Sequence, residues 1–277
     1  MSDIQSQISD IQSQLESAYP TDEARALAWW IAEETTGLSR SQLLCDRKGT
    51  TFFSNTQELQ TIIERLLRFE PVQYIFGHTL WNGLDLLVNP ATLIPRPETA
   101  ELVEKIINHK FDINCRVLDI GTGSGCIAIA LKKNHPEWQV TGIDMSPEAI
   151  DIARQNAIRN NVEVDFRVAD IFDDQIINHK YDIVVSNPPY ICEHERAAMR
   201  PNVLRYEPAS ALFVPDDDPL LFYRRIAQLH LGKHLFFECN EACTGQLQTL
   251  LGQLNYTDIL ISNDSYGKPR FIQCRMA

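Results

Sequence analysis

Residues 116–125 read Arg-Val-Leu-Asp-Ile-Gly-Thr-Gly-Ser-Gly, a short apolar run followed at once by three glycines at alternate positions. The apolar run predicts a buried strand, and Ser124–Asn134 has the composition of a helix. Glycines in a turn between a strand and a helix allow a ligand to approach the backbone beside a helix N-terminus. The stretch therefore predicts an α/β domain with a ligand-binding turn, in preference to a plain tight turn.

The same alternation of strand and helix continues from this turn to the C-terminus. The expected strands are Arg116–Ile120, Gln139–Ile143, Val164–Val168, Tyr181–Ser186, Leu235–Glu238, Asp258–Ser262 and Arg270–Cys274. The expected helices are Ser124–Asn134, Pro147–Asn160, Leu220–His230 and Cys243–Leu254. Such alternation predicts a mostly parallel sheet, here of seven strands, with helices on both faces. The last two strands are joined too tightly for a crossover, so we expect an antiparallel hairpin at one edge.

The chain before this domain has helical periodicity. Residues 2–15 are a duplicated heptad whose apolar residues share one helical face: Ile4, Ile8, Ile11 and Leu15. Two heptads are too few for a coiled coil, so we expect a bundle helix. Further helices are expected over residues 21–35, 39–45 and 56–69. Residues 1–70 are therefore predicted to form a small all-α N-terminal domain that serves packing or partner recognition.

Residues 71–97 have the character of a β-hairpin linker. The apolar runs Val72–His78 and Leu84–Val88 suggest two strands, and Asn82-Gly83 between them is a strong hairpin signal. A helix through Ile107 then opens the α/β domain, which we expect to span residues 98–277.

Composition makes several classes of protein less favoured. The formal net charge is −12, from 25 Lys and Arg against 37 Asp and Glu, which disfavours a nucleic-acid partner because no basic run forms a patch. The seven cysteines include no CxxC pair, so we expect reduced thiols and no metal site. The N-terminus does not read as a signal peptide, and no apolar run is long enough to span a membrane. We expect a soluble, cytoplasmic monomer.

Acidic residues follow two further strands of the predicted sheet. Asp144, with Met145 beside it, can accept both ribose hydroxyls of an adenosine, and Ser146 can cap the following helix in its place. Asp170 can accept the adenine amino group, and Ile171 or Phe172 can cover the ring. The pattern fits either a dinucleotide or S-adenosylmethionine. A dinucleotide turn would need glycine at the position of Cys126.

The most specific motif is Asn187-Pro188-Pro189-Tyr190, after the apolar strand Tyr181–Ser186. Two prolines remove two backbone donors and leave carbonyls to accept hydrogen bonds. The Asn187 side-chain oxygen and the Pro188 carbonyl can together hold both hydrogens of an –NH₂ group, while Tyr190 packs on the planar group. This grip aligns a poorly nucleophilic nitrogen and stabilises the positive charge that develops on methyl transfer, so a strong base is unnecessary.

The glycine turn and the Asn-Pro-Pro-Tyr motif resemble those of class I methyltransferases that modify amide or exocyclic amino nitrogens. Three further stretches resemble the protein-(glutamine-N5) methyltransferases of peptide chain release factors: Glu70–Gly77, Thr92–Thr99 and Arg205–Leu212. The resemblance implies a Rossmann-like class I methyltransferase domain beside the small all-α domain. It runs from about Glu70 to the C-terminus.

The resemblance also implies the reaction and its residues. The methyl donor would be S-adenosylmethionine, leaving S-adenosylhomocysteine, and the acceptor would be the glutamine of the Gly-Gly-Gln loop in a translation termination factor. The residues expected around the donor are Asp119, Gly121, Thr122, Gly123, Ser124, Gly125, Asp144, Met145, Asp170, Ile171, Phe172 and Asn187. Those expected around the acceptor are Asn187, Pro188, Pro189 and Tyr190, with Arg96, Glu98 and Thr99 lining the cleft. Catalysis is assigned to Asn187, Pro188 and Tyr190.

Two features depart from the family pattern, and three alternatives stay open. The segment after the fifth strand, Glu238-Cys-Asn-Glu241, and the heptad duplication are not typical of the family. The nearest alternative is a ribosomal-protein glutamine methyltransferase. A nucleic-acid adenine-N6 methyltransferase would use a similar tetrad, because adenine also presents a planar –NH₂ group. A non-catalytic donor-binding protein is the third alternative.

Overall fold

The computed structural model describes residues 4–45, 56–173 and 180–277. The chain divides into two compact units, one of Met1–Phe76 with Pro201–Tyr206 and one of Gly77–Arg200 with Glu207–Ala277. The first residues of the duplicated heptad, Ser2 and Asp3, lie outside the described residues. The boundaries expected at residues 70 and 97 stay predictions.

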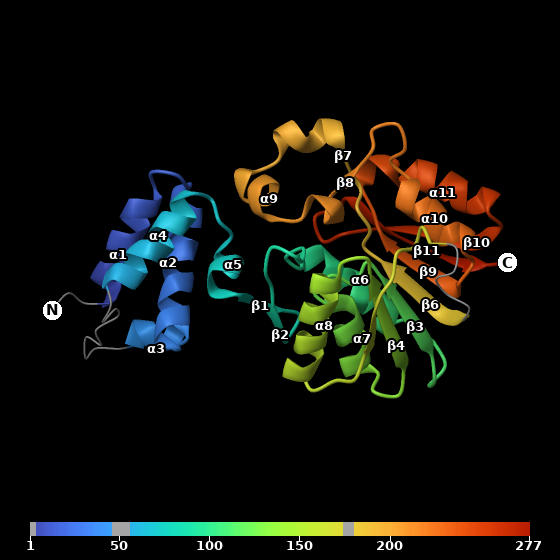
Figure 1. Cartoon of the computed structure of the whole chain (residues 1–277), viewed down its shortest axis with the longest axis horizontal. Helices are drawn as coiled ribbons and strands as arrows, with labels where there is room; N and C mark the ends of the chain where they lie inside the picture. The colour runs from blue at the N-terminus through green and yellow to red at the C-terminus, as the bar shows by residue number, and fades with distance from the viewer. Residues whose placement is uncertain (1–3, 46–55, 174–179) are drawn as a thin grey trace. The chain divides into compact units, whose positions relative to one another are not determined.

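The first unit is helical (Figure 1). Its helices are α1 (Ile4–Leu15), α2 (Thr21–Thr36), α3 (Arg40–Cys45), α4 (Thr56–Leu67), α5 (Val72–Phe76) and α9 (Pro201–Tyr206). The apolar face of the duplicated heptad is buried as predicted, with none of its four side chains more than 4% exposed. Gly37 ends α2 in the left-handed conformation, and its N–H donates to the Glu33 carbonyl. The short α9 joins this unit through Tyr206, whose hydroxyl donates to the Arg68 carbonyl.

The strand expected over Val72–His78 is wrong, because Val72–Phe76 forms the helix α5. Pro71 precedes the helix, and its carbonyl accepts from the N–H groups of Tyr74 (2.9 Å) and Ile75 (3.1 Å). Gly77, with φ of +79°, follows it. Buried apolar side chains in a run of five residues suit a helix turn as well as a strand, so composition alone did not separate the two.

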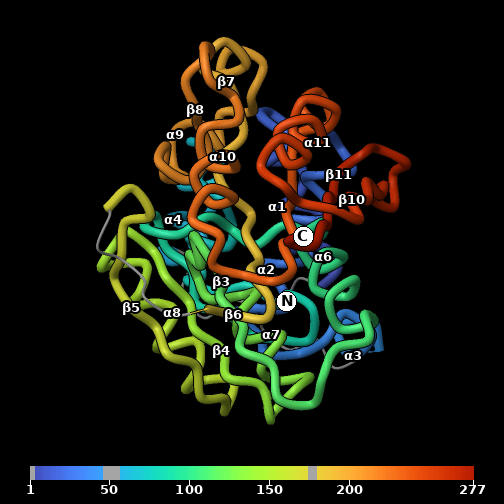
Figure 2. Tube along the Cα trace, turned by 90° about the vertical axis from the view of Figure 1, so that its right-hand side faces the viewer, coloured from blue at the N-terminus to red at the C-terminus, as the bar shows by residue number. Residues whose placement is uncertain are grey.

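The second unit holds a seven-stranded sheet of order β10-β11-β9-β6-β3-β4-β5. Its strands are β3 (Arg116–Ile120), β4 (Gln139–Asp144), β5 (Asp165–Val168), β6 (Tyr181–Ser186), β9 (Gly232–Glu238), β10 (Tyr256–Asn263) and β11 (Pro269–Met276). The four pairings among β5, β4, β3, β6 and β9 are parallel, and β11 pairs antiparallel with both β9 and β10. The predicted Rossmann-like sheet with a C-terminal antiparallel hairpin is confirmed, and Figure 2 shows β3, β4 and β6 side by side.

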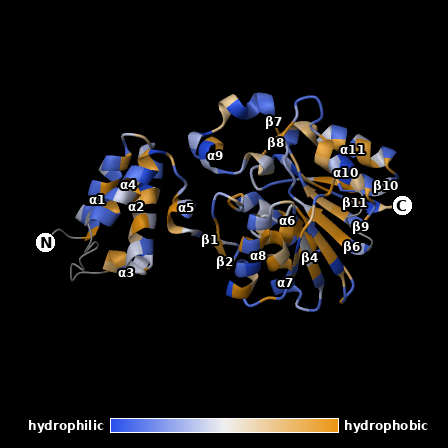
Figure 3. Cartoon of the chain, viewed as in Figure 1, coloured by the Kyte–Doolittle hydropathy of each residue, from blue (hydrophilic) through white to orange (hydrophobic). Residues whose placement is uncertain are grey.

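Helices cover both faces of this sheet (Figures 1 and 3). The helices of the unit are α6 (Pro97–Ile107), α7 (Cys126–Asn134), α8 (Pro147–Arg159), α10 (Leu221–Gln228) and α11 (Thr244–Gln253). One core packs α6, α7 and α8 against alternate strand residues such as Val117 and Phe236. The other packs α10 and α11 against the intervening residues, such as Leu118 and Phe237. Apolar residues therefore run continuously along the central strands, as expected for strands buried on both faces.

The predicted hairpin around Asn82-Gly83 is confirmed by the antiparallel pair β1 (His78–Trp81) and β2 (Leu84–Leu87). It is attached to the sheet domain by Asn156 of α8. The Asn156 side chain accepts from the Leu87 N–H (2.6 Å) and donates to the carbonyls of Leu87 (3.0 Å) and Ser124 (2.9 Å). One buried amide thus joins the hairpin to the glycine turn.

The segment between β6 and α10 contains elements that the sequence analysis did not predict. A parallel pair forms from β7 (Ile191–Cys192) and β8 (Phe213–Val214). The 3₁₀ turns Glu193–Ala198 and Ala209–Ala211 flank α9, and a third, Glu241–Cys243, precedes α11. Two-residue strands carry no readable periodicity, which explains the omission. No helix in the described parts of the chain has the length and apolarity to cross a bilayer.

We predict that Gly142→Ala destabilises the sheet domain. A Cβ on Gly142, in β4, would lie 2.6 Å from the Phe166 ring and 2.8 Å from the Thr122 hydroxyl. Overpacking of this kind lowers the free energy of unfolding by about 1–3 kcal/mol. Gly245→Ala in α11 is the matched control, because a Cβ there meets nothing within 4 Å. Urea denaturation should show a loss for Gly142→Ala and none for Gly245→Ala, and equal midpoints would contradict the packing argument.

Candidate functional site

A cleft of about 340 Å³ opens at the carboxyl ends of β3, β4, β5 and β6. Ligands of open α/β sheets bind at this edge. The cleft is lined by Ala91, Thr92, Leu93, Ile120, Gly121, Gly123, Ile143, Asp144, Met145, Ser146, Ala169, Asp170, Ile171, Phe172, Ser186, Asn187, Pro188, Pro189, Pro208, Ser210, Ala211, Phe222 and Ile226. A larger groove of about 760 Å³ lies at the strand starts, around Arg116, Gln139 and Tyr181. We assign the site to the smaller cleft because it collects the predicted residues.

The three glycines of the turn have different roles. Gly121, Gly123 and Gly125 all have positive φ, at +70°, +54° and +81°. A Cβ on Gly121 or Gly123 would meet nothing, so their backbone faces open space in the cleft. A Cβ on Gly125 would lie 2.9 Å from the Phe166 ring. Gly125 therefore serves close packing beneath the turn and is not among the residues that line the cleft.

Asp119 supports the turn from below. It is fully buried, and its Oδ2 accepts from the Thr122 hydroxyl (2.6 Å) and the Ala128 N–H (3.2 Å). Its Oδ1 is buried and has no hydrogen-bond partner among the described residues. Burial raises the pKa of Asp119 to about 7, against an ordinary value of 3.8. Asp119, Thr122 and Ser124 are all buried and do not line the cleft.

Asp144 reaches the cleft from the end of β4. Its Oδ2 accepts from the Gly123 N–H (2.9 Å), and its Oδ1 accepts from the Ser146 N–H (3.0 Å). Burial raises the pKa of this carboxyl. Ser146 itself caps α8, since its hydroxyl oxygen accepts from the Ala149 N–H. The carboxylate of Asp144 therefore keeps lone pairs for a ligand, such as the hydroxyls of a ribose.

Apolar side chains form a wall of the cleft beside the glycine turn and Asp144. Ile171 is buried, whereas Phe172 is 42% exposed and Met145 is 61% exposed. Phe172 packs edge-on against Phe222, with ring centroids 5.6 Å apart. Asp170 holds the turn, because its Oδ1 accepts from the Phe172 N–H. Exposed apolar side chains at the mouth of a polar turn suit a flat heterocycle, so the wall and Asp144 together fit a nucleoside.

The Asn-Pro-Pro-Tyr segment forms the other half of the cleft. Asn187, Pro188 and Pro189 line it, and Asn187 Nδ2 donates to Thr99 Oγ1 at 3.1 Å. Thr99 lies in the first turn of α6 and is buried behind Asn187. Tyr190 does not line the cleft, and its hydroxyl donates to Glu238 Oε1 at 3.0 Å. Its role in holding an acceptor stays a prediction.

Arg96 and Glu98 lie outside the set that lines the cleft. Arg96 forms a 2.6 Å ion pair with Glu207, whose side chain is buried. Glu207 also accepts from the Ile94 N–H at 3.1 Å. These bonds hold the residues that follow Leu93 to the residue that precedes Pro208, and both Leu93 and Pro208 line the cleft. Burial raises the pKa of Glu238, and Glu98, in the first turn of α6, adds to this rise.

Several residues that line the cleft were not predicted as site residues, among them Leu93, Pro208 and Phe222, and neither were two carboxylates that support it from outside. Glu207 and Glu238 are buried carboxylates that hold Arg96 and Thr99 in place. Glu238 ends an apolar strand and was noted only as part of a departure from the family pattern. An acidic residue at the end of such a strand is a usable signal, because a buried carboxylate requires dedicated donors.

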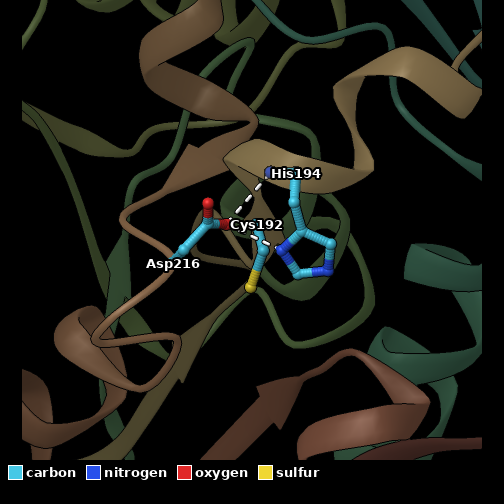
Figure 4. Close-up of side chains that lie close together, drawn as sticks. All are labelled: Cys192, His194 and Asp216. Atoms are coloured by element: carbon cyan, nitrogen blue, oxygen red, sulfur yellow. Dashed lines mark hydrogen bonds and ion pairs between the residues drawn. The ribbon is translucent and has the colours of Figure 1, made fainter.

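The described residues contain one group of potential metal ligands, formed by Cys192, His194 and Asp216 (Figure 4). His194 Nδ1 lies 2.7 Å from Asp216 Oδ1, and the His194 N–H also donates to that oxygen. His194 and Asp216 are exposed, while Cys192 is buried with a raised thiol pKa. The short histidine–aspartate contact is a hydrogen bond that accounts for the group without an ion.

Two family models match the chain. The model described as Methyltransferase small domain matches residues 98–205, and the one described as PrmC N-terminal domain matches residues 8–77. A release factor glutamine methyltransferase of Bacteroides thetaiotaomicron is 43% identical over 95% of this chain and 96% of its own length. A protein of the same name from Flavobacterium psychrophilum is 44% identical over 79% of this chain and 81% of its own.

Solved structures support the fold of the sheet domain. A methyltransferase from Pyrococcus furiosus superposes with a TM-score of 0.51 at 18% identity, over 71% of this chain and 91% of its own. The hMettl16 catalytic domain, solved in complex with the MAT2A 3'UTR hairpin 6, superposes with a TM-score of 0.54 at 18% identity, over 70% of this chain and 76% of its own. At this identity the likeness concerns the fold alone.

We predict that Asp119→Asn changes how stability depends on pH. The folded-state pKa of Asp119 is about 7 and its ordinary value is 3.8, so between these values the folded protein keeps a proton that the unfolded chain releases. Raising the pH across this window therefore lowers the stability of the parent protein. Asparagine does not titrate, so the stability of the variant relative to the parent should increase from about pH 4 to 7. Above this window the difference in stability should stay constant.

Urea denaturation at several pH values measures this difference. Exposed Asp217→Asn is the matched control for loss of one carboxylate. Parallel stability curves for Asp119→Asn and the parent would contradict the assigned burial of Asp119.

Proposed function

The chain belongs to the release factor glutamine methyltransferase family, and on that premise we propose its reaction. It transfers a methyl group from S-adenosylmethionine to the side-chain amide nitrogen of the glutamine in the Gly-Gly-Gln loop of peptide chain release factors. One observation carries the proposal: Asn187, Pro188 and Pro189 line the same cleft as Gly123 and Asp144. Methyl transfer requires the donor and the acceptor nitrogen to share one site.

The residues of the turn fit the proposed donor. Asp144 would accept from the ribose hydroxyls, and the open backbone at Gly121 and Gly123 would lie against the amino-acid part. Ile171 and Phe172 would cover the adenine ring. Asp119 does not line the cleft, but the positive charge of a ligand bound at the turn would favour the ionised form of this carboxyl through space, because a nearby opposite charge lowers a carboxyl pKa. Bound there, the donor supplies an electrophilic methyl on a sulfonium.

The Asn187 side chain and the Pro188 backbone would hold the acceptor amide. Asn187 Nδ2 is engaged by Thr99, which leaves its Oδ1 for one hydrogen of the substrate –NH₂ group. The Pro188 carbonyl would accept the other hydrogen. With both hydrogens held, the nitrogen lone pair points at the methyl, and the two acceptors stabilise the positive charge that develops on nitrogen. The proton can leave after transfer, so the chain needs no strong base.

The test is methyl transfer to defined acceptors. The protein is incubated with S-adenosylmethionine labelled in the methyl group and with a release factor, a ribosomal protein or DNA. We expect label on the release factor alone, and none on a release factor whose Gly-Gly-Gln glutamine is replaced by alanine. Label on the ribosomal protein or on DNA, with none on the release factor, would overturn the proposal.

We predict that Asn187→Ala lowers kcat by a factor of about 100–1000, the range found when one charge-stabilising group is removed from a site. Donor affinity should change little, because the turn at Gly121–Gly125 is intact. Isothermal titration with the donor and single-turnover transfer measure the two effects. Asn263→Ala, on the exposed face of β10, is the matched control. Near-normal turnover of Asn187→Ala would refute the amide grip.

We further propose that the helical unit helps to dock the release factor. Deletion of residues 1–70 should then reduce turnover on the whole release factor by far more than turnover on a short glutamine peptide, because only the whole factor reaches beyond the cleft. The peptide reports whether the sheet domain is intact after the deletion. An equal loss on both substrates would mean that the helical unit serves stability alone.

A further inference from the structure

We infer that Glu238, acting through the hydroxyl of Thr99, sets which end of the Asn187 amide faces the acceptor. Glu238 is therefore a positioning residue for methyl transfer. This inference rests on the proposed function, because it concerns the orientation of the side chain that holds the substrate amide. The geometry that supports it is internal to the sheet domain and does not depend on the identity of the acceptor.

Three elements bring these side chains together. Asn187 follows β6, Thr99 lies in the first turn of α6, and Glu238 is the last residue of β9. Asn187 Nδ2 lies 3.1 Å from Thr99 Oγ1, and Thr99 Oγ1 lies 2.7 Å from Glu238 Oε2. The chain of two hydrogen bonds runs from the cleft into the core, where Glu238 is 1% exposed.

The number of hydrogens on each group determines which group donates in these two hydrogen bonds. A threonine hydroxyl has one hydrogen, and an ionised carboxylate can only accept. When Glu238 is ionised, Thr99 must therefore donate to it, and the Thr99 oxygen can then only accept from Asn187. The –NH₂ end of Asn187 is then turned toward Thr99, and its oxygen is left for the cleft. An asparagine amide has no such preference of its own, so Glu238 supplies it.

Protonation of Glu238 would remove this preference. A neutral carboxyl must donate its hydrogen, and the hydroxyls within reach are those of Thr99 and Tyr190. If the Thr99 oxygen accepts that hydrogen, the Thr99 hydroxyl can donate its own hydrogen to Asn187. The Asn187 side-chain amide then rotates by half a turn so that its oxygen faces Thr99. The cleft would then present –NH₂ to the –NH₂ of the substrate, and two donors cannot bond.

The groups around Glu238 shift its pKa in opposite directions. Burial raises the pKa of Glu238, and Glu98 of α6 raises it further. Thr99 of α6, Tyr190 after β6 and Arg270 of β11 oppose the shift. Arg270 is itself engaged by Asp264 at 3.3 Å. Burial and Glu98 thus favour the neutral form of Glu238, whereas two hydroxyl donors and one nearby cation favour the ionised form, so the loss of one donor shifts this balance toward protonation.

Thr99→Val tests the hydroxyl without changing the shape of the side chain. We expect kcat on the release factor to fall on the order of 100-fold, with the KM for the donor changed less than about twofold. Thr99→Ser restores the hydroxyl and should recover most of the loss. Thr141→Val, in β4 and away from the cleft, is the matched control. A Thr99→Ser variant as slow as Thr99→Val would show that packing, not the hydroxyl, matters, and would overturn the inference.

The pH profile separates positioning from mere stability. The ratio of the parent kcat to the Thr99→Val kcat should be largest at high pH. It should decrease as the pH falls through the raised pKa of Glu238, because protonation of Glu238 disrupts in the parent the same two hydrogen bonds that Thr99→Val removes. Other groups that titrate, such as Asp119, are present in both proteins and cancel in the ratio. A ratio that does not vary with pH would overturn the inference.

A readout without substrate keeps this inference distinct from the proposed function. In protein labelled with ¹⁵N-asparagine, the Asn187 Nδ2 hydrogens should exchange slowly with solvent in the parent and Thr99→Ser and quickly in Thr99→Val. The resonance is assigned with Asn187→Ala. Equal exchange in parent and Thr99→Val overturns the inference even if the release factor is methylated. Absence of label on the release factor overturns the proposed function, while the exchange result still decides the orientation of Asn187.

Discussion

The parallel pairing of β3 with both β4 and β6 is the constraint on which the site depends. Ile120 lies level with Ile143 on one side and with Ser186 on the other. The next residue along each strand, Gly121, Asp144 and Asn187, therefore emerges at the same height on one edge of the sheet. Hydrogen bonds across this edge, such as Gly121 N–H to the Ile143 carbonyl at 2.9 Å, hold the glycine turn to β4. A turn, a carboxylate and an amide acceptor reach one cleft because the strands share a register.

The parts of the site that follow strands could be predicted from the sequence, because strand ends and glycine spacing are local patterns. Asp144 and Asn187 are examples, and both line the cleft. The strand end marks Glu238 as a candidate, but the roles of Glu207 and Glu238 could not be assigned in this way. Their partners Arg96 and Thr99 lie 111 and 139 residues away in the chain, and such contacts follow from the fold, not from local spacing. The helix at Val72–Phe76 was missed because five residues are too few to show a distinct period.

Three buried carboxylates lie around the cleft and none of them lines it: Asp119, Glu207 and Glu238. A buried charge destabilises a protein unless donors satisfy it. Each carboxylate here holds a different structural part, namely the glycine turn, the segment before α6 and the Asn187 amide. The sheet domain thus accepts a local penalty in stability so that the groups facing the cleft have fixed positions before any ligand arrives.

The duplicated heptad of α1 also bears on how the helical unit can vary. Seven residues make almost two full turns, so adding or removing one repeat shifts the apolar stripe by only about 20°. Ile4 and Ile11, one repeat apart, accordingly face the same core. The length of α1 can therefore change in steps of two turns while the remaining residues keep their contacts. A helical unit of this kind can gain or lose outer surface while its core packing is kept. The strands of the sheet cannot change length in the same way, because their pairing register positions the site.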